Sequence, residues 1–386
     1  MIVQVMILQL VSDVIPIIMQ TIDILLVVEV DGVRTNDTLR KDGFLLDREK
    51  KLVINTFSIL LLFLLIANLY STNTMDEPLP IIPIFDSEYF PNLINLISKA
   101  DSSIFISMYV VGNPGWRIDS IFQLIRDRAK RGVSVKIILD DNIESNRFIM
   151  NELRGIDNID VKLDSPAKTT HNKIVIIDGK TTYIGSTNWT ERSLGKANEA
   201  NVIIHNGEIA QYYLEYLNKL WEDSSEDIAP FKEFTGNVIP LLDRQYYDLV
   251  RELIHQAKER VHVMVYGFKL TYQGNSKGDT LAYEIIDAKK RGVDTKVNLN
   301  YEGFSQKMNE YTKEYLSEFL VDVSVQNPGE VTHSKVVIID NVLILGATNW
   351  SYGGLEEWHN TDVMIKDSGI VGIFTEYFNS IFEYQE

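Results

Sequence analysis

Hydrophobic and polar residues alternate in short blocks along residues 84–386. Apolar runs such as IFISMYVV (104–111) and VHVMVYGF (261–268) have the length and the β-branched composition of buried strands. Each is followed by an amphipathic stretch that ends at Lys-Arg-Gly-Val (130–133 and 290–293), then by a second apolar run and another helical stretch. The runs KIVIID and TTYIGS, and later KVVIID and VLILGA, complete the pattern. Alternating strands and helices predict an α/β fold in which helices cover a sheet.

This pattern occurs twice. AKRGVSVKIILD (129–140) matches KKRGVDTKVNLN (289–300), HNKIVIID (171–178) matches HSKVVIID (333–340), and GSTNW (185–189) matches GATNW (346–350). The offsets are 160, 162 and 161 residues, so the two copies are collinear with only small insertions. We place the repeats at 84–228 and 229–386.

An uncharged apolar segment, Leu52–Tyr70, precedes the repeats and has about the length that crosses a bilayer core. Arg48, Lys50 and Lys51 stand before it, whereas the first charge after it is Asp76. The positive-inside rule then predicts a single-pass transmembrane helix over 52–70, with the repeats on the extracytoplasmic side of the membrane. A buried core helix is the alternative. The 51 preceding residues are too many for an ordinary cleaved signal peptide.

The flanks of this segment carry less information. Residues 1–51 give no defined structural prediction, although 14–28 are apolar as well. Residues 71–83 contain three prolines between Pro78 and Pro83 and no helical or strand period, which predicts a linker.

The net charge of −17 is the unusual feature of the composition. Residues 1–75 hold six Lys/Arg and eight Asp/Glu, which leaves −15 on residues 76–386. Such an acidic surface argues against sequence-independent binding along DNA or RNA, because that binding relies on positive patches. The chain has no cysteine, which excludes disulfides, zinc fingers and thiol catalysis.

Two of the six histidines, His171 and His333, occupy equivalent places in the repeats, each with a lysine two positions on. Residues i and i+2 of a strand project to the same face, so His171 and Lys173 point together, as do His333 and Lys335. Each repeat then makes a glycine turn and presents an asparagine, Asn188 or Asn349, beside a tryptophan.

A His, a Lys and an Asn from each repeat would form a pocket suited to phosphodiester cleavage. Lysine supplies a compact positive charge for phosphoryl oxygens, and asparagine adds neutral donors. Two imidazoles can divide the work between a nucleophile and a general acid. No cofactor is needed, and the sequence has neither an HExxH motif nor a clustered His/Asp set that would hold a metal.

A single such motif would more often be a solvated strand end than a site, but its duplication at equivalent positions favours catalysis. The motif aspartates Asp178 and Asp340, which the pattern groups with the catalytic residues, are expected to end a strand and fix a turn. Trp189 and Trp350 are expected to be packing residues rather than stacking platforms for substrate.

The segments THNKIVIIDGKTTYIGSTNW and THSKVVIIDNVLILGATNW closely resemble the paired HKD motifs of the phospholipase D superfamily. The resemblance covers roughly residues 84–386. It implies that each repeat forms an α–β–α layered half, that the halves pack about a pseudo-two-fold axis, and that one active site lies at their interface.

The resemblance also implies a two-step displacement through a phosphohistidine intermediate. His171 would be the nucleophile and His333 the acid–base, although the order of the two can be reversed. The residues implied to hold the phosphate are Lys173, Lys335, Asn188, Asn349 and, in the first repeat, Ser186. Relatives orient a catalytic histidine with a Glu thirteen residues after this serine, and Glu199 stands at that spacing.

The second repeat departs from the pattern, with Ala347 where the first has Ser186 and Asn360 where the first has Glu199. Asp362 or His359 is a possible substitute as the orienting group. Because Ser186 and Glu199 equip the first repeat to bind phosphate and orient its own imidazole, this asymmetry also favours His171 as the nucleophile.

The superfamily includes phospholipases, phospholipid synthases, nucleases and inactive relatives, so the fold does not decide the substrate. The membrane segment and the acidic surface favour hydrolysis or transfer of a phospholipid. A metal-independent nuclease is the first alternative, since GSTNWT and the strand after it resemble the nuclease branch. A membrane-tethered scaffold with an inactive site is the second.

Overall fold

The computed structural model of the chain describes residues 81–271, 273–325 and 329–383. The predicted membrane helix at 52–70 and residues 1–51 therefore lie outside the described residues. Within the described ranges, no helix is both long and apolar enough to span a bilayer.

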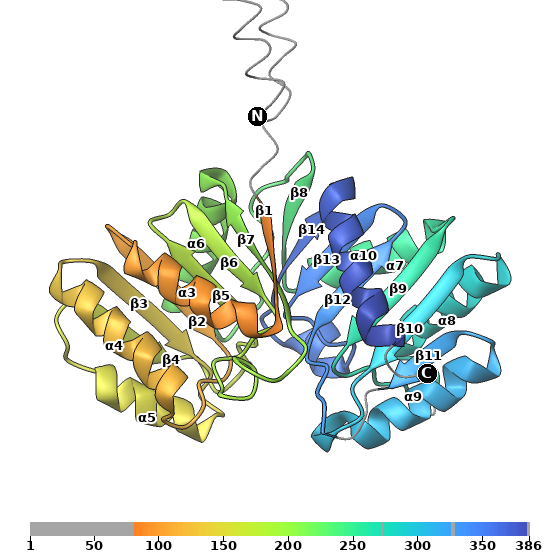
Figure 1. The fold of residues 1–386 in the computed structure, drawn as a ribbon, viewed down its shortest axis with the longest axis horizontal. Coiled ribbons are helices and arrows are strands. Elements are labelled where there is room, and N and C mark those ends of the chain that lie inside the picture. Colours follow the sequence, from red (N-terminus) through yellow and green to blue (C-terminus); the bar gives the residue numbers. More distant parts are fainter. Residues whose placement is uncertain (1–80, 272, 326–328, 384–386) are drawn as a thin grey trace, which may run out of the picture. The chain divides into compact units, whose positions relative to one another are not determined.

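The first repeat is built on a mixed seven-stranded sheet with the order β1-β7-β6-β5-β2-β3-β4 (Figure 1). Its strands are β1 (Ile81–Phe85), β2 (Ser103–Met108), β3 (Ser134–Leu139), β4 (Ile159–Leu163), β5 (Lys173–Ile177), β6 (Thr181–Gly185) and β7 (Ala200–His205). Its helices are the short η1 (Asp86–Glu88), α3 (Tyr89–Ser98), α4 (Trp116–Lys130), α5 (Glu144–Leu153) and α6 (Gly207–Glu222). Strands β2, β3 and β4 run parallel, and the other neighbours are antiparallel.

The second repeat has the same arrangement in the sheet order β11-β10-β9-β12-β13-β14-β8. Its strands are β8 (Val238–Leu242), β9 (Arg260–Val265), β10 (Asp294–Leu299), β11 (Asp322–Val325), β12 (Lys335–Ile339), β13 (Val342–Gly346) and β14 (Thr361–Ile365). Its helices are α7 (Gln245–Gln256), α8 (Lys277–Lys290), η2 (Gly303–Ser305), α9 (Gln306–Glu318), the π-helical turn η3 (Gly353–Glu357) and α10 (Ser368–Glu383). The duplication predicted from the sequence is thus a duplication of the whole sheet.

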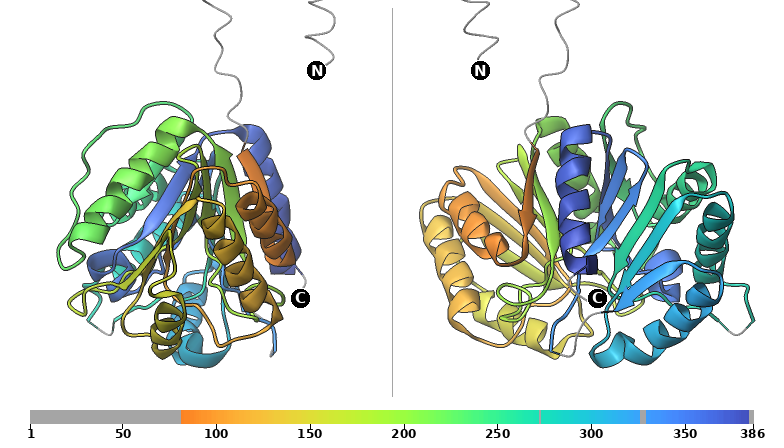
Figure 2. Two further views of the ribbon diagram at one scale, coloured as in Figure 1. Left: turned by 90° about the vertical axis from the view of Figure 1, so that its left-hand side faces the viewer. Right: turned by 45° about the vertical axis from the view of Figure 1, so that its right-hand side comes forward.

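Apolar residues on both faces of each sheet produce a layered core. Successive residues of β2 and β5 face opposite sides of the sheet: Phe105 and Ile176 face a central cluster, while Ile106 and Val175 face an outer one. Helices α3, α4 and α5 cover the outer face of the first sheet, and α7, α8 and α9 cover that of the second. The central cluster joins both sheets with α6 and α10, which lie on opposite sides of the molecule (Figure 2). Each sheet is therefore covered on both faces, as predicted.

The predicted linker over 71–83 extends too far, because Ile81 to Pro83 belong to β1. This strand pairs with β7 at the edge of the sheet, with Pro83 opposite Val202. An edge strand tolerates a proline, which lacks a backbone N–H. Pro240 has the corresponding place in the edge strand β8. The boundary predicted at 228/229 falls in the connection between α6 and β8.

Candidate active site

The two histidines of the repeated motif lie where the repeats meet. His171 stands two residues before β5, and its backbone N–H donates to the carbonyl of His359 in the other repeat (2.9 Å). His333 stands two residues before β12, and its backbone N–H donates to the carbonyl of Asn198 in the first repeat (2.9 Å). Each motif is thereby attached to the segment before the last strand of the opposite repeat, which gives the contact a two-fold character.

The side chain of His171 is paired with an amide. Its Nδ1 lies 3.0 Å from Oδ1 of Asn360, while the amide nitrogen of Asn360 donates to the carbonyls of Gly354 (3.2 Å) and Trp358 (3.3 Å). Those two bonds fix the amide orientation, so the oxygen faces the imidazole and Nδ1 must carry the proton. The Nε2 lone pair of His171 is therefore available to attack an electrophile.

The side chain of His333 is paired with a carboxylate. Its Nδ1 lies 3.0 and 3.1 Å from the two oxygens of Glu199, which is fully buried. Ser186 donates its hydroxyl to the same carboxylate (2.5 Å). A carboxylate stabilises the imidazolium form, so this histidine is suited to carrying a proton on Nε2.

This pairing corrects the role predicted for Glu199. It orients the imidazole of the second repeat, not that of its own, and Asn360 of the second repeat serves His171. The predicted substitutes are also wrong, because Asp362 accepts from the hydroxyl of Thr348 (2.6 Å) and His359 is bonded to Asp243 (3.0 Å).

The two repeats hold an acid and an amide in exchanged positions. In the first, Glu199 contacts a histidine and Asn201 bonds the hydroxyl of Thr187 (2.9 Å). In the second, the amide Asn360 contacts the histidine and the acid Asp362 bonds the equivalent threonine. Asn201 and Asp362 lie across the sheet from the glycines that end β6 and β13, where a Cβ would be 2.4 Å from the Asn201 or Asp362 oxygen. Only glycine permits that approach.

The electrostatic surroundings of the histidines follow from these partners. Burial, with Lys173 and Lys335 nearby, holds the pKa of His171 well below its usual value. Burial also lowers the pKa of His333, but Glu199 opposes this effect. His171 is thus the more firmly neutral imidazole of the two.

Both motif lysines are buried, each 1% exposed, and each ammonium donates to the carbonyl of the histidine two residues earlier. The ammonium of Lys173 lies 4.8 Å from the ring centre of Tyr109, and that of Lys335 lies 5.4 Å from the ring centre of Tyr266. Burial lowers the pKa of Lys335 to about 7, against the attraction of Glu199 and Asp362. An anionic phosphodiester would favour the charged form of both lysines.

A cavity of about 710 Å³ opens over this constellation. Both histidines line it together with Asn188 and Asn349, whose buried amide oxygens have no hydrogen-bond partner among the described residues. A smaller adjoining cavity of about 190 Å³ shares Asn188 and His333. Unpaired buried amides beside a cavity are available to a polar ligand. The structure therefore brings together the predicted His, Lys and Asn sets.

Three predicted site residues have other surroundings. Ser186 is fully buried against Glu199, which makes it a positioning residue for the carboxylate. Asp178 and Asp340 end β5 and β12 at the far end from the histidines, and both have a positive φ (54° and 50°). Each accepts backbone N–H groups from the turn that precedes the neighbouring strand, 101–103 or 258–260. Both aspartates thus lie in turns, as expected, and away from the histidines with which the pattern groups them.

Trp189 and Trp350 are fully buried, as expected of packing residues. Their ring N–H groups donate to the hydroxyls of Tyr89 (3.1 Å) and Tyr246 (2.9 Å). Asn360, Tyr109 and Tyr266 are site residues that the sequence did not predict. The two tyrosines occupy equivalent places in the first strand run of each repeat, so aligning the repeats would have found them.

Replacing Asp178 by Ala is expected to destabilise the fold by about 1–3 kcal/mol, because it removes several hydrogen bonds to a charged acceptor. Burial alone would raise the pKa of Asp178, but N–H groups of Asp101, Ser103 and Ser102 hold it below the usual value. This stabilisation is present above the pKa of the unfolded carboxyl and is lost as the pH falls through the folded pKa. The difference in urea unfolding between wild type and variant should therefore be largest at neutral pH and shrink in acid. A variant of unchanged stability but much lower kcat would return Asp178 to the catalytic set.

No group of three His, Cys, Asp or Glu side chains in the described part of the chain is placed to hold a metal ion.

Comparison with known proteins identifies the family. A family model described as "Cardiolipin synthase, PLD-like domain" matches residues 93–221 and again residues 250–382. The phospholipase D of Rickettsia conorii is 33% identical over 129 residues, which are 33% of this chain and 62% of that protein. The mitochondrial cardiolipin hydrolase of Mus musculus is 28% identical over 132 residues, 34% of this chain and 57% of its own length.

Longer matches include cardiolipin synthase A of Yersinia pseudotuberculosis, 24% identical over 300 residues, or 68% of this chain and 60% of that protein. This chain thus spans about three fifths of the length of each curated relative. The crystal structure of a phosphatidylserine synthase from Haemophilus influenzae superposes with a TM-score of 0.63 and 12% identity, covering 80% of this chain and 88% of that one. Because the family model matches both repeats, this chain belongs to the phospholipase D superfamily.

Proposed function

We propose that this chain is a phosphodiesterase that cleaves or transfers the phosphodiester of a phospholipid through a phosphohistidine intermediate. The observation that carries the proposal is the pair of histidines on one cavity, one bonded to an amide and the other to a carboxylate. Two imidazoles with different partners can hold different protonation states, which nucleophilic attack and leaving-group protonation require at the same time.

In the first step, Nε2 of His171 attacks phosphorus and forms an N–P bond while the P–O bond to the leaving alcohol breaks. The proton on Nε2 of His333 passes to that oxygen. In the second step, His333 takes a proton from water or from an acceptor alcohol, whose oxygen attacks phosphorus and releases His171. Lys173, Lys335 and the two asparagine amides supply positive charge and donors for the phosphoryl oxygens.

The assignment of His171 as the nucleophile now rests on its partner. Asn360 holds the proton on Nδ1 without adding charge, and burial with two lysines keeps the ring neutral. Glu199 favours the protonated form of His333. The sequence also favours His171 as the nucleophile. That prediction paired Glu199 with His171, whereas Glu199 contacts His333.

A phospholipid substrate is supported by the names of the relatives, which include a phospholipase D and a cardiolipin hydrolase, and by the net charge of −17. Nucleic acid binding gains most of its affinity from neutralised phosphates, which an acidic surface opposes. The test is to assay the full chain on phosphatidylcholine, cardiolipin and single-stranded DNA. Cleavage of DNA with no cleavage of either lipid would favour the nuclease alternative.

Activity is expected to survive excess EDTA. Nucleophile, acid and charge stabilisation are all assigned to side chains of this chain, so no step depends on a metal. The measurement is the rate of phosphodiester cleavage before and after dialysis against the chelator. Loss of activity that Mg²⁺ or Zn²⁺ restores would contradict the mechanism.

We further propose that Leu52–Tyr70 anchors the enzyme in a membrane with both repeats on the extracytoplasmic side, because Arg48, Lys50 and Lys51 precede this apolar segment. A protease added to intact cells is then expected to digest the region after Tyr70. Protection of that region until the cells are lysed would reverse the orientation.

A further inference from the structure

The cavity over the histidines has an unequal lining. The first repeat contributes Tyr109, His171 and Asn188, while the larger wall comes from the second repeat. Its members are Tyr266, Gly267, Lys269, Phe304, Lys307, Met308, His333, Asn349, Ser351, Tyr352, Gly353, Glu357 and Trp358. Aromatic and aliphatic side chains therefore gather on the second-repeat side of the cavity, beside the histidines and asparagines that line it.

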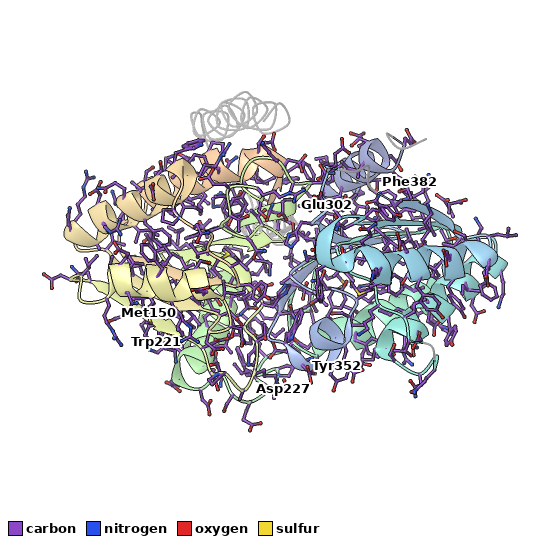
Figure 3. The ribbon with its side chains drawn as sticks, turned by 90° about the horizontal axis from the view of Figure 1, so that it is seen from below. Met150, Trp221, Asp227, Glu302, Tyr352 and Phe382 are labelled. Atoms are coloured by element: carbon purple, nitrogen blue, oxygen red, sulfur yellow. The ribbon has the colours of Figure 1, made fainter. Side chains whose placement is uncertain are left out.

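Two of these aromatic residues extend into solvent. The side chain of Phe304 in η2 is 93% exposed, and that of Tyr352, just before η3, is 57% exposed. Figure 3 shows Tyr352 and Glu302, two residues before Phe304, both on the second-repeat side of the seam between the repeats. Single exposed apolar residues are common, but two at the rim of one catalytic cavity form a surface that water solvates poorly.

The charge around this rim differs from that of the whole chain. Lys269 and Lys307 line the cavity against a single carboxylate, Glu357, although the net charge of the protein is −17. Exposed aromatic rings together with lysines are typical of surfaces that enter the head-group region of a bilayer. The lysines would face lipid phosphates, which attract positive side chains near an anionic surface.

We propose that Phe304 and Tyr352, with Met308, Lys269 and Lys307, form the surface by which this enzyme enters the face of a phospholipid bilayer. The inference rests on the proposed phospholipid chemistry and names how the substrate reaches it. The acyl part of a lipid would lie along Phe304 and Met308 while its phosphate lies between the histidines. The overall acidity favours this occupant over a single-stranded nucleic acid, which would also stack on aromatic rings but needs extended positive charge.

The absence of cysteine from the sequence permits a direct test. A fluorophore on the full chain carrying Phe304→Cys is expected to be quenched by doxyl-labelled lipid in vesicles of phosphatidylcholine and phosphatidylglycerol. The matched control is Phe148→Cys, which replaces a phenylalanine in α5 that is 49% exposed and does not line this cavity. The two labels are placed in otherwise identical full chains, so any attachment to the vesicles through other residues is present in both variants. Equal quenching at the two positions, or a response at 304 to single-stranded DNA and not to vesicles, would overturn the proposal.

Turnover supplies an independent measurement. Phe304→Ser is expected to lower the rate on vesicle phospholipid about tenfold more than the rate on soluble bis(p-nitrophenyl) phosphate, since burying a phenylalanine contributes about one decade or more to partitioning. Phe148→Ser should leave the ratio of the two rates unchanged. A ratio unchanged in Phe304→Ser would refute the surface. Lipid-specific quenching at 304 without cleavage of any lipid diester would instead refute the proposed function and leave the surface standing.

Discussion

Replacing His171 by Ala is expected to abolish turnover and, with it, the covalent phosphoryl adduct. The substitution removes the Nε2 lone pair of an imidazole that burial and the two nearby lysines keep neutral. The loss of kcat should exceed the roughly 10²–10⁴-fold that a general acid–base group contributes. Acid quenching during turnover of a labelled substrate, followed by peptide mapping of the acid-labile adduct, measures both effects.

His333→Ala is the matched comparison. It should lower kcat by about 10²–10⁴-fold on an alkyl diester, because the leaving oxygen then departs without a proton. On a substrate with a good leaving group, such as p-nitrophenolate, protonation matters less, so the adduct on His171 should still form and then persist. Label on His333 alone would reverse the two roles, and an active enzyme without an adduct on either histidine would remove the mechanism.

Replacing Glu199 by Gln is expected to change the chemistry of the opposite repeat. The amide cannot stabilise an imidazolium as the carboxylate does, so the pKa of His333 falls. The acid form of His333 is lost as the pH rises through that pKa, and the alkaline limb of the kcat/KM profile should therefore move to lower pH. We expect kcat to fall by about 10²–10⁴-fold at neutral pH, a range suggested by removal of the orienting carboxylate in serine proteases.

The control is the converse change, Asn360→Asp. A carboxylate beside His171 favours its protonated form, so its pKa rises and the acid limb of the profile should move to higher pH. The alkaline limb, which belongs to His333, should keep its place. If Glu199→Gln shifts the acid limb and Asn360→Asp the alkaline one, the partners act within their own repeats and the crossed arrangement is refuted.

The sequence was sufficient for what depends on local periodicity and on the duplication. It predicted the paired α/β repeats, the His and Lys on one strand face and the Asn after each glycine turn. The partners of the histidines were beyond it, because Glu199 and His333 are 134 residues apart and His171 and Asn360 are 189 apart. The spacing of residues along a strand predicts which side chains share a face, but not which distant segment of the chain contacts them. The start of the first repeat was placed too late for a similar reason. The prolines before Ile84 indicate a linker, and only the sheet order shows that Ile81 to Pro83 belong to the edge strand β1.

The crossed attachment of the motifs has a consequence for biosynthesis. As the ribosome makes the chain, the whole first repeat is synthesised before the second exists. At that stage His171 has no Asn360 to fix its tautomer, and Glu199 is a carboxylate with no imidazole to serve. A working pair of histidines arises only when β14 is in place, near the end of the described chain. We therefore expect nascent and truncated products to be inert toward phosphodiesters, so that activity appears only in the finished molecule.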